Sequence, residues 1–135
     1  MKVFIKEIAL KTSRWIEMVD ITSLIRGAVS ESGVKEGLCV VYSPHTTAAI
    51  TVNENADPSV RHDIENKLSE LVPYSARYSH LEGNADAHIK TTMVGPSETL
   101  IVTGGALYLG TWQGVFFAEF DGPRSRRVVV RVMGD

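Results

Sequence analysis

Residues 38–60 read LCVVYSPHTTAAITVNENADPSV, and this stretch decides the fold that the sequence predicts. The unbroken apolar run at 38–43 is typical of a buried strand. A Ser-Pro turn follows it, and the apolar residues at 47–52 predict a second strand. Asp57 and Pro58 then start a helix, as an N-cap residue and a proline in the first turn. Two strands and a helix in so short a stretch indicate a chain that mixes helices with sheet.

The flanking sequence adds further strands and another helix. Short apolar runs predict strands at residues 3–10, 14–19, 99–105, 114–120 and 126–133. Apolar residues recur on one helical face between Ile21 and Val29. Asp20 is expected to cap this helix, and Gly33 to end it.

Two more helical patterns lie in the middle of the chain. The helix that starts after Asp57 carries an apolar stripe at Val60, Ile64, Leu68 and Leu71, and it ends at Pro73. Residues 86–96 predict a short helix with Asp86 as its cap. Together these elements predict a single α+β domain over residues 1–135, with a mostly antiparallel sheet and two or three helices packed on it.

The composition fits one globular domain and excludes several partners. The chain has 135 residues, of which 44% are hydrophobic and 22% charged, and its formal net charge is −2. A charge so near balance gives no reason to expect nucleic acid or an anionic membrane as a partner. No signal peptide is visible, and no apolar run is long enough to span a bilayer. We therefore expect a cytoplasmic protein, with Cys39 as a buried free thiol.

Three of the four histidines are candidate metal ligands. His45 opens a strand after a proline, while His80 and His88 bracket an acidic loop. Three neutral imidazoles from separate segments would leave a coordination position open for water or a substrate, as catalytic metal sites require. The alternative is that each ring hydrogen-bonds locally and binds no metal, because the spacing matches no zinc-finger pattern. His62 lies away from the apolar stripe of its helix and is expected to face solvent.

Acidic and amide side chains supply a second set of candidates. Asn53, Glu54 and Asp57 follow the strand at 47–52. Asn53 suits a turn and Asp57 a helix cap, whereas Glu54 has no such structural explanation. Glu119 lies in GVFFAEF, a strand that is apolar on both faces, so a buried carboxylate there needs a cation, a metal or a raised pKa. The alternative is that Glu119 is solvated at the end of the strand.

Glycine-rich and basic segments are candidates for binding a substrate. The run TGGALYLGTWQG lets backbone N–H groups approach a ligand, on which Trp112 could stack and to which Gln113 could hydrogen-bond. Arg124 lies in DGPRSRR and could hold a phosphate group, although a solvated basic strand edge is the commoner case.

Three stretches of the chain resemble the YjbQ family, whose small members are often described as secondary thiamine-phosphate synthases. They are HTTAAITVNENADPSVRHDIE at 45–65, HLEGNADAHIKTTMVG at 80–95 and SETLIVTGGALYLGTWQGVFFAEFDGPRSRRVVV at 97–130. The resemblance extends over roughly residues 4–133, and GTWQG at 110–114 is its most specific motif. It implies an α+β domain that forms a homotrimer, with a polar cluster and a divalent metal ion near the subunit contacts.

The resemblance, together with the chemistry of these residues, leads to an expected function. We expect a metal-dependent enzyme that acts on a small phosphorylated or heterocyclic metabolite, with thiamine-phosphate synthesis as the named candidate. The expected catalytic residues are His45, Asn53, Glu54, Asp57 and Glu119; the substrate-binding residues are Thr46, Lys90, Trp112, Gln113 and Arg124; and Zn²⁺ or Mg²⁺ would bind His45, His80 and His88. The alternatives are a non-catalytic trimer that binds a metabolite or metal, and a hydrolase that uses a metal-bound water.

The length of the strand at 47–52 raises a geometric question. A six-residue strand spans roughly 20 Å, so His45 and Asn53, which flank it, cannot meet through this segment alone. Either the other candidate histidines and Glu119 gather at the His45 end, or a neighbouring subunit supplies the missing residues.

Overall fold

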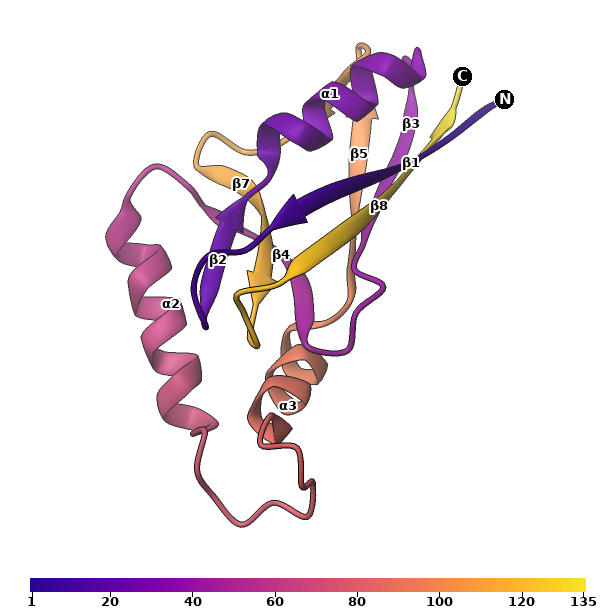
Figure 1. Cartoon of the computed structure of the whole chain (residues 1–135). Helices are drawn as coiled ribbons and strands as arrows, with labels where there is room; N and C mark the ends of the chain where they lie inside the picture. The colour runs from indigo at the N-terminus through magenta and orange to yellow at the C-terminus, as the bar shows by residue number, and fades with distance from the viewer.

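The computed structural model describes all 135 residues and contains eight strands and three helices (Figure 1). In chain order they are β1 (Lys2–Lys11), β2 (Glu17–Asp20), α1 (Thr22–Ser32), β3 (Gly37–Tyr42), β4 (Ala48–Glu54), α2 (Pro58–Leu71), α3 (Ala85–Val94), β5 (Ser97–Thr103), β6 (Ala106–Tyr108), β7 (Gln113–Glu119) and β8 (Ser125–Gly134). No helix is both long and apolar enough to cross a membrane.

The strands divide between two sheets. One has five strands in the order β1-β8-β3-β5-β6, and the other has three in the order β2-β7-β4. Every pairing in both sheets is antiparallel. The predicted α+β class with antiparallel pairing is therefore confirmed, whereas the sequence does not predict the division into two sheets.

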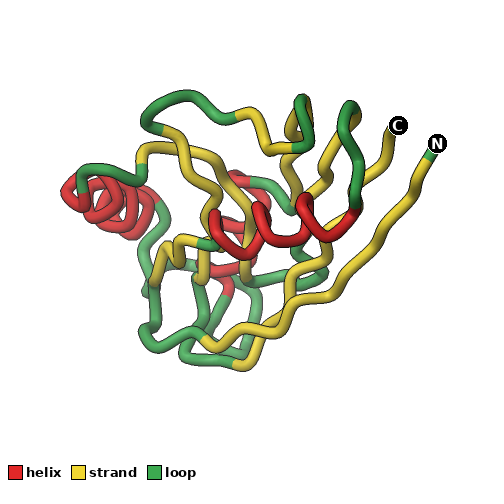
Figure 2. The backbone as a smooth tube through the Cα atoms, turned by 90° about the horizontal axis from the view of Figure 1, so that it is seen from above, coloured by secondary structure: helices red, strands yellow, loops and turns green.

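The main hydrophobic core lies between the two sheets. Ile50 and Phe117 project into it from the three-stranded sheet and Val130 from the five-stranded sheet, and all three are fully buried. Helix α1, which adds Ile25 and Val29, contacts strands of both sheets and crosses in front of them in Figure 2. Full burial of an aliphatic or aromatic side chain stabilises a fold by about 1.5–3 kcal/mol. This core therefore holds the sheets and α1 together.

The three-stranded sheet is covered on its second face as well. There Ala49, Ala118 and Phe120 form a smaller cluster with Ala87 of α3, and Leu68 of α2 packs against it. Because one face of β7 meets the main core and the other meets the helices, the strand is apolar on both faces. This explains the unusual pattern of GVFFAEF and places α2 and α3 on the side of the molecule away from the five-stranded sheet (Figure 1).

Two of the predicted helix boundaries are confirmed. The side chain of Asp57 accepts a hydrogen bond from the backbone N–H of Ser59 at 2.9 Å, as an N-cap residue should. Gly33 ends α1 in the left-handed conformation with φ 70°, which a glycine adopts without the steric cost of a Cβ.

Two other predicted caps are wrong by one or two residues. Ile21, not Asp20, occupies the N-cap position of α1, although the Asp20 carboxylate still accepts a hydrogen bond from the Thr22 N–H at 3.0 Å. Asn84 occupies the N-cap position of α3, because Asp86 turns inward within the first helical turn and is buried. Leu71 also departs from the predicted apolar stripe of α2, since it is 59% exposed at the end of the helix.

Candidate functional site

Strand β4 separates the candidate site residues into two groups. At its start Ala48 pairs with Glu119, and at its end Glu54 pairs with Gln113. His45, Thr46, Glu119 and the two histidines of the α3 region lie at the start of the strand, whereas Asn53, Glu54, Asp57, Trp112 and Gln113 lie at its end. Of the two arrangements that the strand length allows, the structure has the one in which the other candidate histidines and Glu119 gather at the His45 end.

His80 and His88 lie next to each other at the mouth of an open hollow. Their ring centroids are 5.3 Å apart with an interplanar angle of 79°, in an edge-to-face arrangement. The hollow has a volume of about 420 Å³ and is also lined by Arg77, Tyr78 and Ser79. The Arg77 guanidinium, the Ser79 hydroxyl and the His88 imidazole offer hydrogen-bond donors suited to an anionic group such as a phosphate, whereas the Tyr78 hydroxyl already donates to Pro73 O.

A second hollow lies on the other side of His88. It has a volume of about 470 Å³, and His45, Thr46, His88, Thr91, Thr92 and Pro96 line it. The Oγ1 atom of Thr91 is buried there and has no hydrogen-bond partner within the chain. His88 is therefore a wall of both hollows, which join the imidazoles of three separate segments of the chain.

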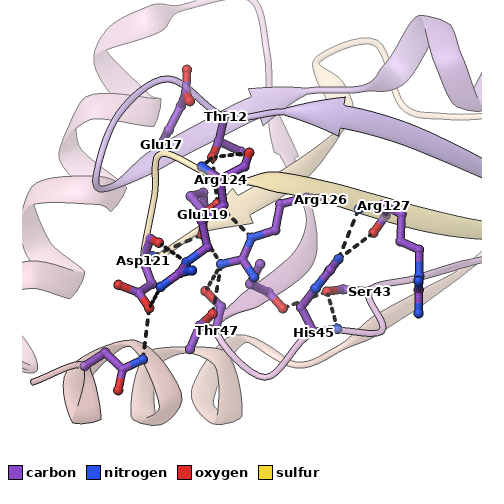
Figure 3. Close-up of polar contacts among 12 residues, drawn as sticks. Thr12, Glu17, Ser43, His45, Thr47, Glu119, Asp121, Arg124, Arg126 and Arg127 are labelled. Carbon is purple, nitrogen blue, oxygen red and sulfur yellow. Dashed lines mark hydrogen bonds and ion pairs between the residues drawn. The ribbon is translucent and has the colours of Figure 1, made fainter. Parts of the chain in front are cut away.

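His45 is held as a neutral imidazole. Burial is the main cause that lowers its pKa below 6.5, and the charge of the nearby Arg126 lowers it further. Its Nε2 atom lies 3.0 Å from the backbone nitrogen and 3.2 Å from the backbone oxygen of Arg127 (Figure 3). In one neutral tautomer Nε2 accepts from the N–H and Nδ1 carries the proton; in the other Nε2 donates to the carbonyl and Nδ1 has the lone pair. Nδ1 is therefore the ring nitrogen left for a ligand, as a donor in the first tautomer and as an acceptor in the second.

Glu119 is fully buried and forms an ion pair with Arg126 (Figure 3). The guanidinium donates to both carboxylate oxygens, one of them through Nε at 2.8 Å. Thr12 Oγ1 donates to the same carboxylate at 2.7 Å, and so does the Asp121 backbone N–H at 3.1 Å. Burial alone would raise the pKa of Glu119, but these hydrogen bonds and the charge of Arg126 together lower it below 4.5.

The environment of Glu119 resolves both sequence hypotheses about it. Its predicted solvated position is wrong, and the cation that a buried carboxylate needs is Arg126. Arg126 also donates to Thr47 Oγ1 at 2.8 Å, which ties the ion pair to the turn that carries His45. Glu119 has no exposed surface and contacts that turn through Arg126; its catalytic role stays a prediction.

A chain of hydrogen bonds connects His80 to the buried ion pair. His80 Nε2 lies 2.8 Å from Asn84 Oδ1, and the Asn84 amide donates to Asp121 at 2.9 Å. Since a carboxamide oxygen only accepts, Nε2 of His80 carries a proton and Nδ1 has the free lone pair when the ring is neutral. Arg124 also donates to the Asp121 carboxylate at 3.0 Å, so it supports this series of hydrogen bonds, and its side chain is half-exposed.

Lys90, a predicted substrate-binding residue, lies away from both hollows. Its side chain is fully buried in α3, and its ammonium group lies 3.0 Å from the carboxylate of Asp86, one helical turn earlier. The ring of Trp15 covers it at 5.7 Å. Lys90 and Asp86 thus form a second buried ion pair, and neither hollow is lined by the lysine.

The residues at the far end of β4 organise the local backbone. Asp57 caps α2, and its hydrogen bonds with Ser59 lower its pKa. The side chain of Gln113 accepts a hydrogen bond from the Gly110 N–H at 2.8 Å and closes the glycine-rich loop, whereas Trp112 is 63% exposed. Asn53 lines a separate hollow beneath α2. One chain therefore does not bring these residues to the histidines, and their catalytic roles stay predictions.

The three predicted metal ligands do not form a complete set within one chain. His80 and His88 adjoin, but His45 faces only the second hollow and uses Nε2 for the Arg127 backbone. No group of three or more His, Cys, Asp or Glu side chains is arranged to hold a metal ion. A structural or catalytic zinc site takes at least three protein ligands. The chain by itself thus offers two imidazole donors at most.

Several residues of this site carry no recognisable sequence signal. Arg77, Asn84 and Asp121 lie in loops, and Arg126 precedes Arg127 and a run of three valines in a strand that reads as an ordinary basic edge. Only the odd position of Glu119 indicates that a cation is needed nearby, and it does not say which one. His62 is exposed as predicted, with 65% of its side chain accessible.

The chain belongs to the YjbQ-like UPF0047 protein family, whose sequence model matches residues 6–135. It is 60% identical over 126 residues to UPF0047 protein MJ1081 of Methanocaldococcus jannaschii, covering 93% of this chain and 91% of that protein. It is 45% identical over 131 residues to UPF0047 protein YugU of Bacillus subtilis, covering 96% and 99% of the two chains.

Solved structures with the same fold come from bacteria and archaea. A YjbQ/UPF0047 protein of Clostridium acetobutylicum superposes with a TM-score of 0.94 at 52% identity, covering 95% of this chain and 99% of that one. A YbjQ-like protein of unknown function from Sulfolobus solfataricus has a TM-score of 0.96 at 37% identity, covering 99% of both chains. None of these four descriptions gives an activity, so the function has to be argued from the site.

Proposed function

We propose that this protein is an enzyme that binds a small phosphorylated or heterocyclic metabolite in the two hollows around His88. The observation that carries the proposal is the convergence of three imidazoles from separate segments on these adjoining hollows. Imidazole is the side chain whose unperturbed pKa best suits proton transfer near neutral pH. A polar wall of threonine hydroxyls beside them adds groups that can orient a ligand.

The residues take different roles in this proposal. Arg77 and His88 bind the phosphate group in the first hollow, because both can donate hydrogen bonds to an anion. His80 offers Nδ1 as a proton acceptor, since its Nε2–H donates to Asn84, whose amide in turn donates to Asp121. His45, through Nδ1, and Thr46 form hydrogen bonds with the part of the ligand that occupies the second hollow.

The two ends of the buried Glu119–Arg126 pair act on the site through the backbone. Arg126 holds Thr47, and Thr47 follows directly on His45 and Thr46. Arg127 supplies the backbone groups that orient the His45 ring. The ion pair thus fixes the positions of the groups that would contact a ligand, without contacting it.

The named candidate reaction is the synthesis of thiamine phosphate. In this reaction the nitrogen of a thiazole phosphate supplies the electron pair of a new bond to the methylene carbon of a pyrimidine diphosphate. The bond from that carbon to the diphosphate oxygen breaks, and pyrophosphate leaves with the bonding electrons. The first hollow, with its guanidinium and imidazoles, is suited to hold the diphosphate group, and the second is suited to hold a polar heterocycle.

Dependence on a divalent metal ion is part of the proposal. His80, through Nδ1, and His88 would supply two nitrogen donors, and His80 would then bind the ion in place of accepting a proton. The third donor would come from another subunit of the homotrimer that the family resemblance implies. Such an ion neutralises the charge of a leaving diphosphate. A binding protein without catalysis is the second candidate, because no carboxylate lines either hollow.

Product formation from the two precursors tests the proposal, with His88→Ala as the variant and His62→Ala as the matched control. We expect turnover by the wild type and by His62→Ala, and a loss of about 100-fold or more in His88→Ala. Calorimetric binding of the precursors without turnover would assign the binding function instead. The absence of both binding and turnover would contradict the proposal. Elemental analysis of protein purified without an affinity tag then tests whether a metal ion is bound. The absence of stoichiometric metal after incubation with Zn²⁺ or Mg²⁺ would contradict the proposed metal dependence.

A further inference from the structure

Another hollow lies on the helix side of the three-stranded sheet, beneath α2. Helix α2 contacts β2 at one edge of this sheet, and α3 contacts β4 at the other (Figure 1). The hollow lies between them, because its lining residues come from both helices and from all three strands, and its volume is about 330 Å³. It shares no lining residue with either hollow around His88. We call it the α2 hollow.

The floor of the α2 hollow is apolar and is formed by a small residue between two large ones. Phe116, Ala118 and Phe120 of the β7 segment face α2, so an alanine methyl lies between two aromatic rings. Ala118 also pairs with Ala49 of β4, which is equally small. The other apolar lining residues are Met18, Ile64, Leu68 and Val94. This part of the hollow suits the apolar body of a ligand, because its burial there is favourable.

Hydrogen-bond donors lie on the β4 side of the α2 hollow. Thr51 and Asn53 alternate with core residues along β4, so both side chains line the hollow. Asn53 Oδ1 accepts a hydrogen bond from the Glu54 N–H at 2.7 Å, which leaves the NH2 group of the amide to donate. The Thr51 hydroxyl is a second donor beside it. Together they suit a ligand group that accepts hydrogen bonds.

Positive charge borders the α2 hollow. Lys67 lines it, and its ammonium group forms only an exposed ion pair with Glu70 at 3.3 Å. Such a surface pair contributes little, so a ligand can replace it at small cost. The guanidinium of Arg61 lies 4.9 Å over the ring of Phe116, which pairs with Thr51. The Nε atom of Arg61 is buried and has no hydrogen-bond partner. Two basic side chains are thus available to an anionic ligand.

The carboxylate that lines the α2 hollow already has partners. Glu65 is buried, accepts a hydrogen bond from the Met18 N–H at 2.7 Å and pairs with Arg14 at 3.3 Å. His62 Nδ1 lies 3.6 Å from its other oxygen. Met18 belongs to β2, at the opposite edge of the sheet from β4. The negative charge of Glu65 is therefore compensated and lies away from the donors on β4.

We propose that the α2 hollow binds a small carboxylic acid with a compact apolar body. The body packs between Ala118 and Leu68, and the carboxylate accepts hydrogen bonds from Thr51, Asn53 and Lys67. The hollow is at the lower end of the range of ligand pockets, roughly 300–1,000 Å³, so it takes a single ring or a short branched chain. Because this site lies apart from the hollows around His88, its test does not depend on turnover there.

Binding of benzoate, followed by chemical-shift changes in isotope-labelled protein, tests the proposal, with benzamide as the uncharged counterpart. We expect benzoate to shift the resonances of Thr51 and Ala118 and to bind about tenfold more tightly than benzamide, because charge-assisted hydrogen bonds are the stronger ones. Lys67→Met should remove most of this preference. Lys6→Met is the matched control, since Lys6 also forms an exposed ion pair, at 2.7 Å from Glu31, but on the other sheet. Equal affinity for the two probes would overturn the assignment of a carboxylate.

Filling the α2 hollow tests the location of the site. Ala118→Val enlarges the floor and Leu68→Phe enlarges the side chain that α2 contributes, and each should weaken benzoate binding about tenfold or more. Circular dichroism verifies that the variants are folded, and Leu68→Phe serves alone if the buried Ala118 does not tolerate valine. Inorganic phosphate should leave the resonances of Thr51 and Ala118 unmoved. No saturable binding of benzoate, or binding that the folded variants leave unchanged, would overturn the proposal.

Discussion

Arg126 donates hydrogen bonds to both carboxylate oxygens of Glu119, and both side chains are buried beneath the turn that carries His45. The pair lies between β7 and β8, which belong to different sheets. Its hydrogen bonds to Thr12 and Thr47 extend the contact to two further segments. One ion pair therefore links the two sheets at the end of the molecule where the hollows lie.

Replacing Glu119 tests how much this ion pair contributes to the stability of the fold. Glu119→Ala leaves the charge of Arg126 buried without a partner, and we expect a loss of about 3–5 kcal/mol in the free energy of unfolding. The double variant Glu119→Leu/Arg126→Met removes both charges and should recover much of that loss. Urea denaturation measures both. A single variant as stable as the wild type would show that water or another group already screens the arginine.

The same pair predicts a dependence of stability on acid. The pKa of Glu119 lies below 4.5 in the folded protein, so folding favours the charged form. Its contribution is complete above about pH 4.5 and is lost as the pH falls through the lower folded pKa. We expect the free energy of unfolding to decline more steeply below that pH in the wild type than in Glu119→Gln. Equal slopes in the two proteins would contradict this.

His45 predicts a second change of stability, at higher pH. Its folded pKa is lowered from 6.5, so just below pH 6.5 the unfolded chain takes up a proton that the folded chain does not. Stability should therefore fall as the pH drops from 6.5 toward the folded pKa, and His45→Asn should remove this part of the slope. Denaturation curves at closely spaced pH values measure it. A slope unchanged in the variant would mean that His45 is protonated equally in both states.

Asp57 separates a structural role from the predicted catalytic one. Asp57→Ala removes the N-cap of α2 and should lower the free energy of unfolding by about 1 kcal/mol, while Asp57→Ser should keep most of it. If capping is the only role, ligand binding and turnover are the same in both variants. An activity lost equally in the serine and alanine variants, with stability kept in the serine variant, would support the predicted catalytic role of Asp57.

Lys90 makes the same separation for substrate binding. Lys90→Met leaves the carboxylate of Asp86 buried and unpaired and should lower the free energy of unfolding by about 3–5 kcal/mol. At a temperature where the variant remains folded, its affinity for inorganic phosphate should equal that of the wild type, whereas Arg77→Met should weaken it. A phosphate affinity that falls in Lys90→Met alone would mean that α3 opens to admit the ligand.

Local patterns predict the elements of this fold well, because each depends on neighbours in sequence. The apolar run at 38–43, the cap at Asp57 and the stop at Gly33 act within a few residues, and the structure has strands and helices there. Asp86 shows the limit of such signals. Asn84 and Asp86 are both good caps, and only the burial of Asp86 against Lys90 decides between them.

The site depends on contacts that local patterns do not contain. GVFFAEF leaves open whether Glu119 is buried and in need of a cation or solvated at the end of the strand. The sequence also does not say that Arg126 lies opposite it, because that depends on the path of the chain between β7 and β8. The proximity of His80 and His88 depends on the loop before α3.

The position of His88 between the two hollows has a thermodynamic consequence. A ligand in either hollow would fix the orientation of the same imidazole ring, so the affinity of each hollow would depend on whether the other is filled. Such linkage is reciprocal: whatever factor the first ligand applies to the second, the second applies to the first. Titration of one ligand with and without the other measures that factor, and a value of one would mean that His88 is indifferent to both.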